Sequence, residues 1–173
     1  MLILHYPERP INDVETQPMG EHSDYGFLTM LMGSEKGLQL RNVNNEWVDI
    51  DPIPGCFVIN IGDMLQKMTQ GLYKSTPHRV VPTGKERYSI PYFYDPGWDE
   101  TISVLDFPMS KEEEDVVKKT QTYKRIDNIK VDCLNKTIGE YYILKHSTNF
   151  PELAEKYLKE WTTHDLHINM LFN

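Results

Sequence analysis

Cysteine and positive charge are both scarce in this chain of 173 residues, and each scarcity excludes a class of protein. The two cysteines, Cys56 and Cys133, are too few for a disulfide framework and fit a reducing compartment. Lysine and arginine (18 residues) are outnumbered by aspartate and glutamate (26 residues), which gives a formal charge of −8. That balance argues against nucleic acid or an anionic membrane as a partner.

Long apolar runs are missing as well. No run approaches the roughly 18 residues of a membrane span. The opening residues 1–7 have no basic region before their short apolar run, so we do not expect a signal peptide. A cytoplasmic protein is therefore the expectation. The hydrophobic fraction of 39% is still sufficient for one globular domain with a real core.

The sequence reads as a series of short strands with glycine and proline between them, a pattern typical of a barrel or sandwich. The predicted strands are 2–6, 27–32, 37–41, 46–50 and 56–61, with a short strand or turn at 64–69. The composition changes after Gly97, so we divide the chain into 1–97 and 98–173. The second part contains a capping box at Ser110 and Glu113, and helical spacing over 137–146 and 152–161.

Two histidines and one aspartate form the pattern with the clearest chemistry. His22 and Asp24 are two positions apart, so on a strand their side chains point to the same side. His78 must come from a different strand. Two imidazoles and one carboxylate are the protein ligands of non-haem ferrous sites, which leave positions open for substrate-like ligands and dioxygen. We therefore predict that His22, Asp24 and His78 bind one metal ion.

A second group of residues, Arg87 and Ser89, points to an acid beside this metal. The segment 75–94 reads as two strands around Pro82–Lys85, which has a turn composition. If these strands form a hairpin, His78 lies opposite Ser89, and both face inward with Arg87. Burying a guanidinium is costly unless an anion pairs with it. Its planar fork of N–H donors suits a carboxylate. The sequence thus predicts a small acid held by Arg87 and Ser89.

Together these motifs resemble the iron(II)- and 2-oxoglutarate-dependent oxygenases, and more closely their isopenicillin N synthase-like branch. The likeness is dense over residues 2–96 and continues loosely through 139–142 and 150–153. It rests on His22-x-Asp24, His78 and Arg87-x-Ser89, framed by the stretches 2–7, 37–40, 60–63 and 73–80.

The resemblance implies a mainly β fold, a double-stranded β-helix (a cupin-like jelly roll) with C-terminal α-helices packing on the barrel. It implies Fe(II) as the metal and 2-oxoglutarate as the acid, with ascorbate as a further candidate cofactor. Tyr6, which precedes Pro7, becomes a candidate contact to the 2-oxoglutarate. The implied reaction couples oxidative decarboxylation of 2-oxoglutarate to dioxygen-dependent hydroxylation or desaturation of a small-molecule substrate.

Two alternatives stay open. In isopenicillin N synthase-like oxidases the Arg-x-Ser pair holds the substrate's own carboxylate, and 2-oxoglutarate is not used. The other alternative is a catalytically impaired, metal-binding fragment, because family members carry a largely helical segment before the strand that begins here at Leu2. Without that cover, an apolar barrel face would favour a homodimer or aggregation. The substrate itself leaves no motif.

Several other residues could be taken for metal ligands or binding residues, but a structural role explains them better. Asp63 is expected to be a turn carboxylate that bonds backbone amides, not a fourth ligand. His164 and His167 are three positions apart, lack a third ligand and are expected in a surface tail. Arg79 is expected to point away from the site. The aromatic residues 92–94 are expected to belong to the core more than to a substrate pocket.

Overall fold

The computed structural model describes residues 1–11, 18–120 and 132–157. The chain forms two compact units, which are described separately below. One unit joins Met1–Asp95 to Pro108–Thr122, and the other joins Pro96–Phe107 to Tyr123–Asn173. The division that we predicted between residues 97 and 98 stays a prediction.

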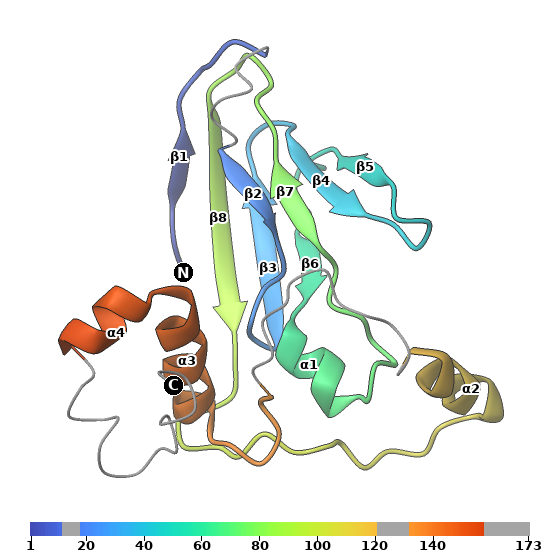
Figure 1. The fold of residues 1–173 in the computed structure, drawn as a ribbon. Helices are drawn as coiled ribbons and strands as arrows, with labels where there is room; N and C mark the ends of the chain where they lie inside the picture. The colour runs from blue at the N-terminus through green and yellow to red at the C-terminus, as the bar shows by residue number, and fades with distance from the viewer. Residues whose placement is uncertain (12–17, 121–131, 158–173) are drawn as a thin grey trace. The chain divides into compact units, whose positions relative to one another are not determined.

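In the described part of the first unit, eight antiparallel strands form two four-stranded sheets (Figure 1). One sheet has the order β1 (Leu4–Tyr6), β8 (Arg87–Tyr94), β3 (Leu28–Gly33) and β6 (Val58–Ile61). The other sheet has the order β2 (Met19–His22), β7 (His78–Val80), β4 (Leu38–Arg41) and β5 (Trp47–Ile50). Eight strands divided in this way are typical of a jelly roll. The predicted fold class is confirmed.

The strands β7 and β8 do not form the hairpin that the sequence suggested. The turn between them is present, with Gly84 at a φ of +75°, but β7 pairs with β2 and β4 whereas β8 pairs with β1 and β3. The predicted pairing of His78 with Ser89 is therefore wrong. The connection crosses from one sheet to the other, as jelly-roll connections do, and His78 and Ser89 both line the cavity between the sheets.

The hairpin of β4 and β5 agrees with the prediction. Arg41 pairs with Trp47, and the turn between them places Asn45 at a φ of 67°. Asparagine tolerates this left-handed conformation better than most residues do. The Asn44-Asn45 pair therefore marked the turn correctly.

A short helix, α1 (Asp63–Met68), replaces the strand or turn that we predicted at 64–69. Its buried apolar residues are Met64, Leu65 and Met68. Met68 lies four positions after Met64 and three after Leu65, so the three side chains lie on one side of the helix. A run this short does not separate helix from strand by periodicity, and the acidic Asp63 in its first turn was the better signal.

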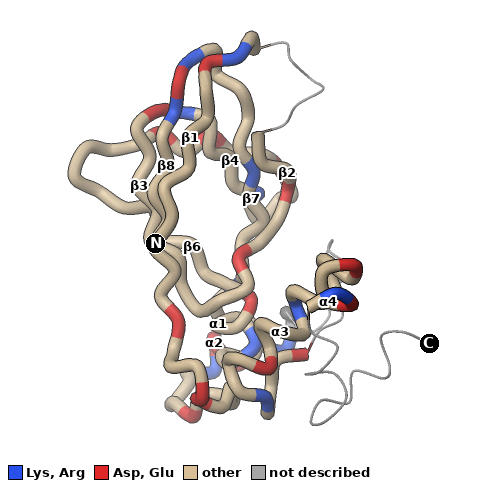
Figure 2. Tube along the Cα trace, turned by 90° about the vertical axis from the view of Figure 1, so that its left-hand side faces the viewer, with Lys and Arg blue, Asp and Glu red and all other residues tan. Residues whose placement is uncertain are grey.

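The two faces of the β1–β8–β3–β6 sheet differ in polarity. Thr29 pairs with both Asn60 and Phe93, and Thr29 and Asn60 are each only 3% exposed. Tyr92 and Tyr94 point to the opposite face, where they are 45% and 55% exposed, and Phe93 is 41% exposed and faces the space between the sheets. The expected core position of residues 92–94 is therefore wrong. Arg87 is the one lysine, arginine, aspartate or glutamate within these four strands (Figure 2).

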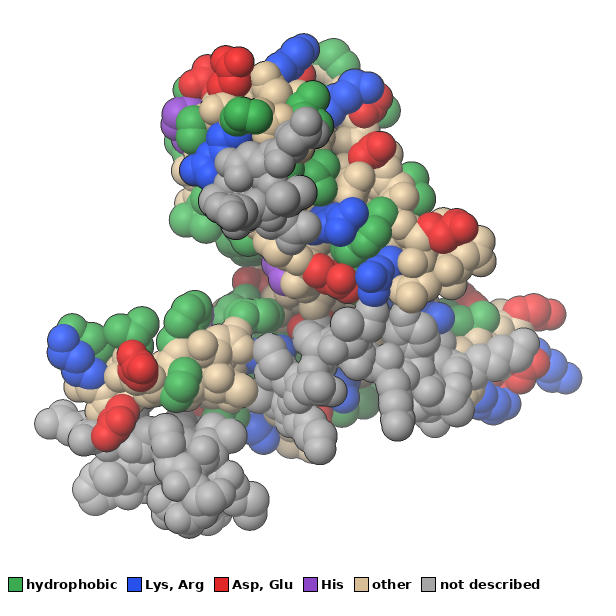
Figure 3. All heavy atoms as spheres, turned by 45° about the horizontal axis from the view of Figure 1, so that its top comes forward, with side chains coloured by type: hydrophobic (Ala, Val, Ile, Leu, Met, Phe, Trp, Pro, Cys, Tyr) green, Lys and Arg blue, Asp and Glu red, His purple; other side chains and the backbone are tan. Residues whose placement is uncertain are grey.

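The helix α2 (Lys111–Thr120) completes the described part of the first unit. Ser110 and Glu113 exchange hydrogen bonds of 2.7 and 3.2 Å, which is the predicted capping box. Acidic and basic side chains are interspersed on the surface seen in Figure 3, so the net negative charge does not gather there into one large patch.

The second unit contains the helices α3 (Ile138–Asn149) and α4 (Pro151–Tyr157). Thr137 caps α3 in a capping box with Glu140, which confirms the predicted helix start. The ring of Trp98 stacks on Tyr142 at 6.5 Å between centroids, and a Cβ atom at Gly139 would collide with the indole of Trp98. None of the helices in the described part of the chain combines the length and apolarity of a membrane span. Packing of these helices on the barrel stays a prediction.

Candidate metal centre

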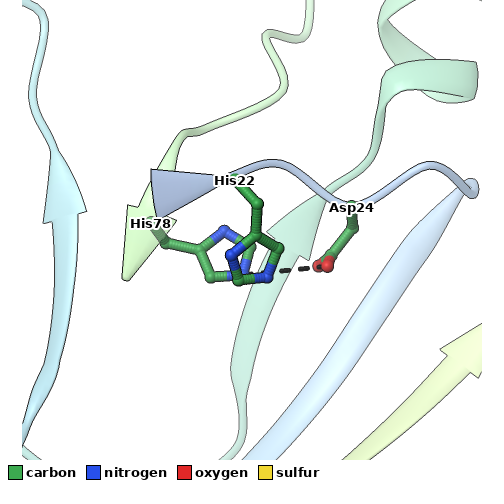
Figure 4. A group of neighbouring side chains, drawn as sticks. All are labelled: His22, Asp24 and His78. Carbon is green, nitrogen blue, oxygen red and sulfur yellow. Dashed lines mark ion pairs between the residues drawn. The ribbon is translucent and has the colours of Figure 1, made fainter. Parts of the chain in front are cut away.

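The side chains of His22, Asp24 and His78 converge at one point in the first unit (Figure 4). His22 ends β2, Asp24 lies just beyond it, and His78 begins β7. One potential ligand atom from each of the three residues lies within 4.8 Å of the others, and His78 Nε2 is 3.7 Å from Asp24 Oδ1. Metal–imidazole bonds of about 2.1 Å join ligand atoms up to roughly 4.2 Å apart, so small side-chain rotations bring all three onto one ion.

The backbone fixes which nitrogen of each histidine faces the centre. His22 Nδ1 lies 2.8 Å from the carbonyl oxygen of Gly20, and His78 Nδ1 lies 3.1 Å from that of Thr76. A carbonyl oxygen only accepts, so each Nδ1 carries the proton and donates it. Both Nε2 atoms are then left with a lone pair, the arrangement found in metal-binding histidines.

The electrostatic surroundings of His78 favour the neutral ring that a metal requires. Burial lowers the pKa of His78, the nearby His22 lowers it further, and the charge of Asp24 partly opposes both effects. His78 is only 6% exposed. Its imidazole is therefore uncharged and available as a ligand at neutral pH.

The prediction that His22 and Asp24 share a strand is wrong, because β2 ends at His22. The main chain at Asp24 is instead held by the start of α1, where the amide of Asp63 donates to the Asp24 carbonyl oxygen at 2.9 Å. This approach needs a glycine at position 62, because a Cβ atom there would collide with the carbonyl oxygen of Gly26. The stretch from Asn60 to Asp63 therefore supports the metal site.

Asp63 itself is not part of the cluster of three. Its Oδ1 accepts a hydrogen bond of 2.7 Å from the hydroxyl of Ser75, and the amide of Ser75 donates to Gln66 Oε1 at 2.7 Å. These contacts join α1 to the segment that leads into His78. One short helix thus contacts the chain segments of both Asp24 and His78.

Arg87 carries a buried, positively charged side chain. Its side chain is 3% exposed, and its Nε donates to the carbonyl oxygen of Glu35 at 3.3 Å. Its buried Nη1 has no hydrogen-bond partner among the residues that the structure describes. Within residues 1–11, 18–120 and 132–157, no carboxylate forms an ion pair with it. Burial lowers the pKa of Arg87, but a guanidinium stays charged in proteins. Such a group calls for an anionic ligand.

Ser89 and Tyr6 lie next to this guanidinium. Ser89 follows Arg87 by two positions on β8 and is 3% exposed, and Tyr6 pairs with Arg87 across β1 and β8. The guanidinium carbon lies 5.1 Å from the centre of the Tyr6 ring. Burial raises the pKa of Tyr6 against the opposing effect of Arg87, so the phenol keeps its proton and can donate it to an acceptor.

A cavity of about 150 Å³ between the two sheets brings the predicted residues together. One water molecule needs roughly a tenth of this volume, so a small dicarboxylate has room. All six predicted site residues line it, namely Tyr6, His22, Asp24, His78, Arg87 and Ser89. Asn60, which our residue-level prediction missed, lines it as well. The available signal was a polar residue inside the apolar strand Val58–Ile61.

The other candidates lie elsewhere. Arg79 Nε donates to Gln39 Oε1 at 2.7 Å, and its guanidinium lies 4.1 Å from the centre of the Trp47 ring. Arg79 does not line the cavity between the sheets, as expected. His164 and His167 lie outside the described residues.

Comparison with known proteins identifies relatives of this site and fold. The model of the 2OG-Fe(II) oxygenase superfamily matches residues 1–96. A probable iron/ascorbate oxidoreductase of Dictyostelium discoideum is 37% identical over 149 residues, covering 85% of this chain and 40% of that protein. Homoarginine-6-hydroxylase of Glycine max is 38% identical over 137 residues, covering 78% and 37%.

A solved structure agrees with these sequence matches. A full-length protein of Neurospora crassa, solved in complex with alpha-KG and 5-formyluracil, superposes with a TM-score of 0.61 at 30% identity, covering 83% of this chain and 44% of that chain. This chain spans about two fifths of the length of the curated relatives it matches.

Proposed function

Because this chain belongs to the 2OG-Fe(II) oxygenase superfamily, we propose that it binds ferrous iron and 2-oxoglutarate and uses dioxygen to oxidise a small-molecule substrate. The substrate is hydroxylated or desaturated while 2-oxoglutarate is decarboxylated. The strands β1, β2, β7 and β8 and the residue Asp24, just beyond β2, supply the binding groups, and all of them belong to the first unit.

The donor set suits ferrous iron. His22 and His78 present Nε2 lone pairs and Asp24 presents a carboxylate, which is the facial set of two histidines and one carboxylate that non-haem iron prefers. The carboxylate neutralises part of the charge of the dication. Three protein ligands leave the remaining positions for exogenous ligands.

The observation that carries the proposal is the buried guanidinium of Arg87, which forms no ion pair within the described part of the chain. A buried guanidinium with a free Nη1 is unfavourable without an anion, and its fork matches the two oxygens of a carboxylate. Ser89 and the protonated Tyr6 add hydroxyl groups beside it. In this proposal the three residues bind the distal carboxylate of 2-oxoglutarate, and the same cavity also contains the metal-binding side chains.

When bound, ferrous iron together with 2-oxoglutarate and dioxygen supplies the oxidising equivalent that attacks an aliphatic C–H bond. The protein's own contribution is to position the reactants and to exclude water. Buried apolar side chains that line the cavity, Leu31, Leu38 and Val80, limit the entry of water. The strands β2, β7 and β8 position His22, His78 and Arg87. The hydrogen bond from the amide of Asp63 positions the main chain of Asp24.

Anaerobic titration tests the proposal. Addition of one equivalent of ferrous iron and then 2-oxoglutarate should give a weak visible charge-transfer band, because 2-oxoglutarate chelates the iron. The Asp24→Ala variant should lose the iron and the band. The control variant Arg79→Gln should retain both, because Arg79 contacts Gln39 and Trp47 and does not line the cavity. One equivalent of tightly bound iron without a band on addition of 2-oxoglutarate would contradict the proposal.

The oxidase alternative, in which Arg87 and Ser89 hold the substrate's own carboxylate, needs a separate measurement. The same geometry suits either acid. Release of labelled carbon dioxide from 2-oxoglutarate, measured with and without candidate substrates, separates the two cases. Release that depends on iron supports the dioxygenase. Iron-dependent oxidation of a substrate without any such release would support the oxidase instead.

Self-association and location belong to the same proposal. The outer face of the β1–β8–β3–β6 sheet carries exposed apolar side chains, among them Met32, Ile59 and Tyr92 at 45%, 53% and 45% exposure, which supports a homodimer or aggregation through this face. Light scattering across a concentration series tests it, and a monomer at all concentrations would contradict it. The proposed cytoplasmic location is supported by Cys56 and Cys133, neither of which forms a disulfide.

A further inference from the structure

Asn60 occupies an unusual position for an amide side chain. It is the third residue of β6, it is 3% exposed, and it lines the cavity between the sheets. Its neighbours on the strand, Ile59 and Ile61, are apolar. A buried amide is unfavourable unless its donors and its acceptor find partners.

Within the described part of the chain, the side chain of Asn60 has one hydrogen-bond partner, the carboxylate of Asp24. Asn60 Nδ2 lies 3.5 Å from Asp24 Oδ2. A carboxylate accepts only, so the amide must present its nitrogen to Asp24, and its oxygen therefore points elsewhere. Among the residues that the structure describes, nothing donates to this buried Oδ1.

The two oxygens of Asp24 consequently have different surroundings. Oδ1 lies 3.7 Å from His78 Nε2, toward the point where the histidines meet, and Oδ2 faces the amide of Asn60. The main chain of Asp24 is fixed separately by the amide of Asp63. Two residues of one four-residue stretch, Asn60 and Asp63, thus contact the side chain and the main chain of Asp24.

We propose that Asn60 is a positioning residue that makes Asp24 a one-oxygen metal ligand. Its amide engages Oδ2, so that Oδ1 alone is directed to the metal and the carboxylate does not occupy a second coordination position. The unpartnered Oδ1 of Asn60 supports a role other than stability, because the amide is poorly satisfied where it lies. This inference rests on the proposed metal site.

The variant Asn60→Leu tests the inference, because leucine has a similar size but no donor. The control is Thr29→Val, since Thr29 pairs with Asn60 across the two strands, is equally buried and lines the same cavity. Three quantities are measured on each protein: the affinity for ferrous iron under anaerobic conditions, the visible spectrum of the Co(II)-loaded form, and the Tm of the metal-free form.

We expect Asn60→Leu to bind iron about 10- to 100-fold more weakly, which is the usual effect of removing a partner of a metal ligand. Its Co(II) spectrum should change, and its metal-free Tm should equal or exceed that of the wild type. Thr29→Val should keep the iron affinity and the spectrum. If the leucine variant does not fold, Asn60→Val, with a strand-forming side chain, replaces it.

Other results would overturn the inference in distinguishable ways. Iron affinity within threefold of the wild type, with an unchanged spectrum, would show that Asn60 does not act on Asp24. A large fall in the metal-free Tm of both Asn60 variants would assign Asn60 a purely structural role. Failure of the wild-type protein itself to bind iron would instead refute the proposed function, and this inference with it.

Discussion

Replacement of Arg87 by methionine separates binding from stability. The guanidinium is 3% exposed, and its Nη1 has no partner among the described residues. If its role is to bind a carboxylate, Arg87→Met removes one partner of a buried charged pair. Such a loss costs about 2–5 kcal/mol. At about 1.4 kcal/mol for each factor of ten, 2-oxoglutarate should bind roughly 30-fold to several-thousand-fold more weakly.

The stability of the ligand-free protein should respond in the opposite sense. Replacing a whole buried ion pair by apolar side chains of similar volume is often neutral or stabilising, by about 1–4 kcal/mol. In the ligand-free protein the Nη1 of Arg87 has no partner among the described residues, so replacement by methionine removes the cost of a buried charge without leaving a counter-charge behind. Arg87→Met should therefore unfold at the same or a higher temperature than the wild type when 2-oxoglutarate is absent. Arg87→Lys keeps the charge but loses the planar fork of the guanidinium. Its affinity for 2-oxoglutarate should therefore lie between that of the wild type and that of Arg87→Met.

The assay is an anaerobic titration of the iron-loaded protein with 2-oxoglutarate, together with thermal unfolding of the ligand-free form. Arg79→Met serves as the matched control, because Arg79 contacts Gln39 and Trp47 and does not line the cavity. Binding of 2-oxoglutarate to Arg87→Met within threefold of the wild-type affinity would refute the reasoning.

Three further predictions concern the two units. Gly62→Ala should lower the free energy of unfolding by about 1–3 kcal/mol and weaken metal binding, because the new methyl group collides with the Gly26 carbonyl oxygen and displaces the main chain at the metal site. Gly139→Ala should destabilise the second unit by a similar amount, because it collides with the indole of Trp98, and should leave metal affinity unchanged. The metal-free protein should lose stability as the pH falls below 6.5, because the folded protein lowers the pKa of His78 from this value and the unfolded chain then binds more protons.

Chemical denaturation and metal titration check the two glycine variants, with Gly97→Ala as the control, since a Cβ atom there meets only Glu100 Cγ at 3.4 Å. Wild-type stability of Gly62→Ala would contradict the close approach. The pH prediction is checked by denaturation of the wild type and of His78→Gln in the presence of a chelator. Identical slopes of stability against pH below 6.5 in the two proteins would contradict it.

Residue types predicted the site better than local geometry did. His22, Asp24 and His78 were predicted because two imidazoles and one carboxylate form a ferrous donor set, and Arg87 because an inward guanidinium is costly without an anion. The structure places all four along one cavity. The geometric arguments behind them were wrong in two places: β2 ends before Asp24, and β7 and β8 belong to different sheets. The residues still converge, because in a jelly roll the inward side chains of both sheets share one interior.

The features that sequence reasoning missed depend on contacts between distant segments. Neither the start of α1 that holds Asp24 nor the bond from Ser75 to Asp63 follows from any local pattern. The inward amide of Asn60 was visible only as a polar residue within an apolar strand. By contrast, the capping box of Ser110 and Glu113 was predicted, because the two partners lie three positions apart. The one at Thr137 has the same local spacing, but we predicted only the helix that it begins.

The central claim is that His22, Asp24 and His78 bind one ferrous ion with an acid anchored by Arg87 beside it. A crystal structure of the protein loaded anaerobically with ferrous iron and 2-oxoglutarate tests it most directly. We predict a single iron bound by Nε2 of both histidines and one oxygen of Asp24, with the distal carboxylate of 2-oxoglutarate on the guanidinium of Arg87. Iron bound at other residues, or 2-oxoglutarate placed away from Arg87, would contradict the account.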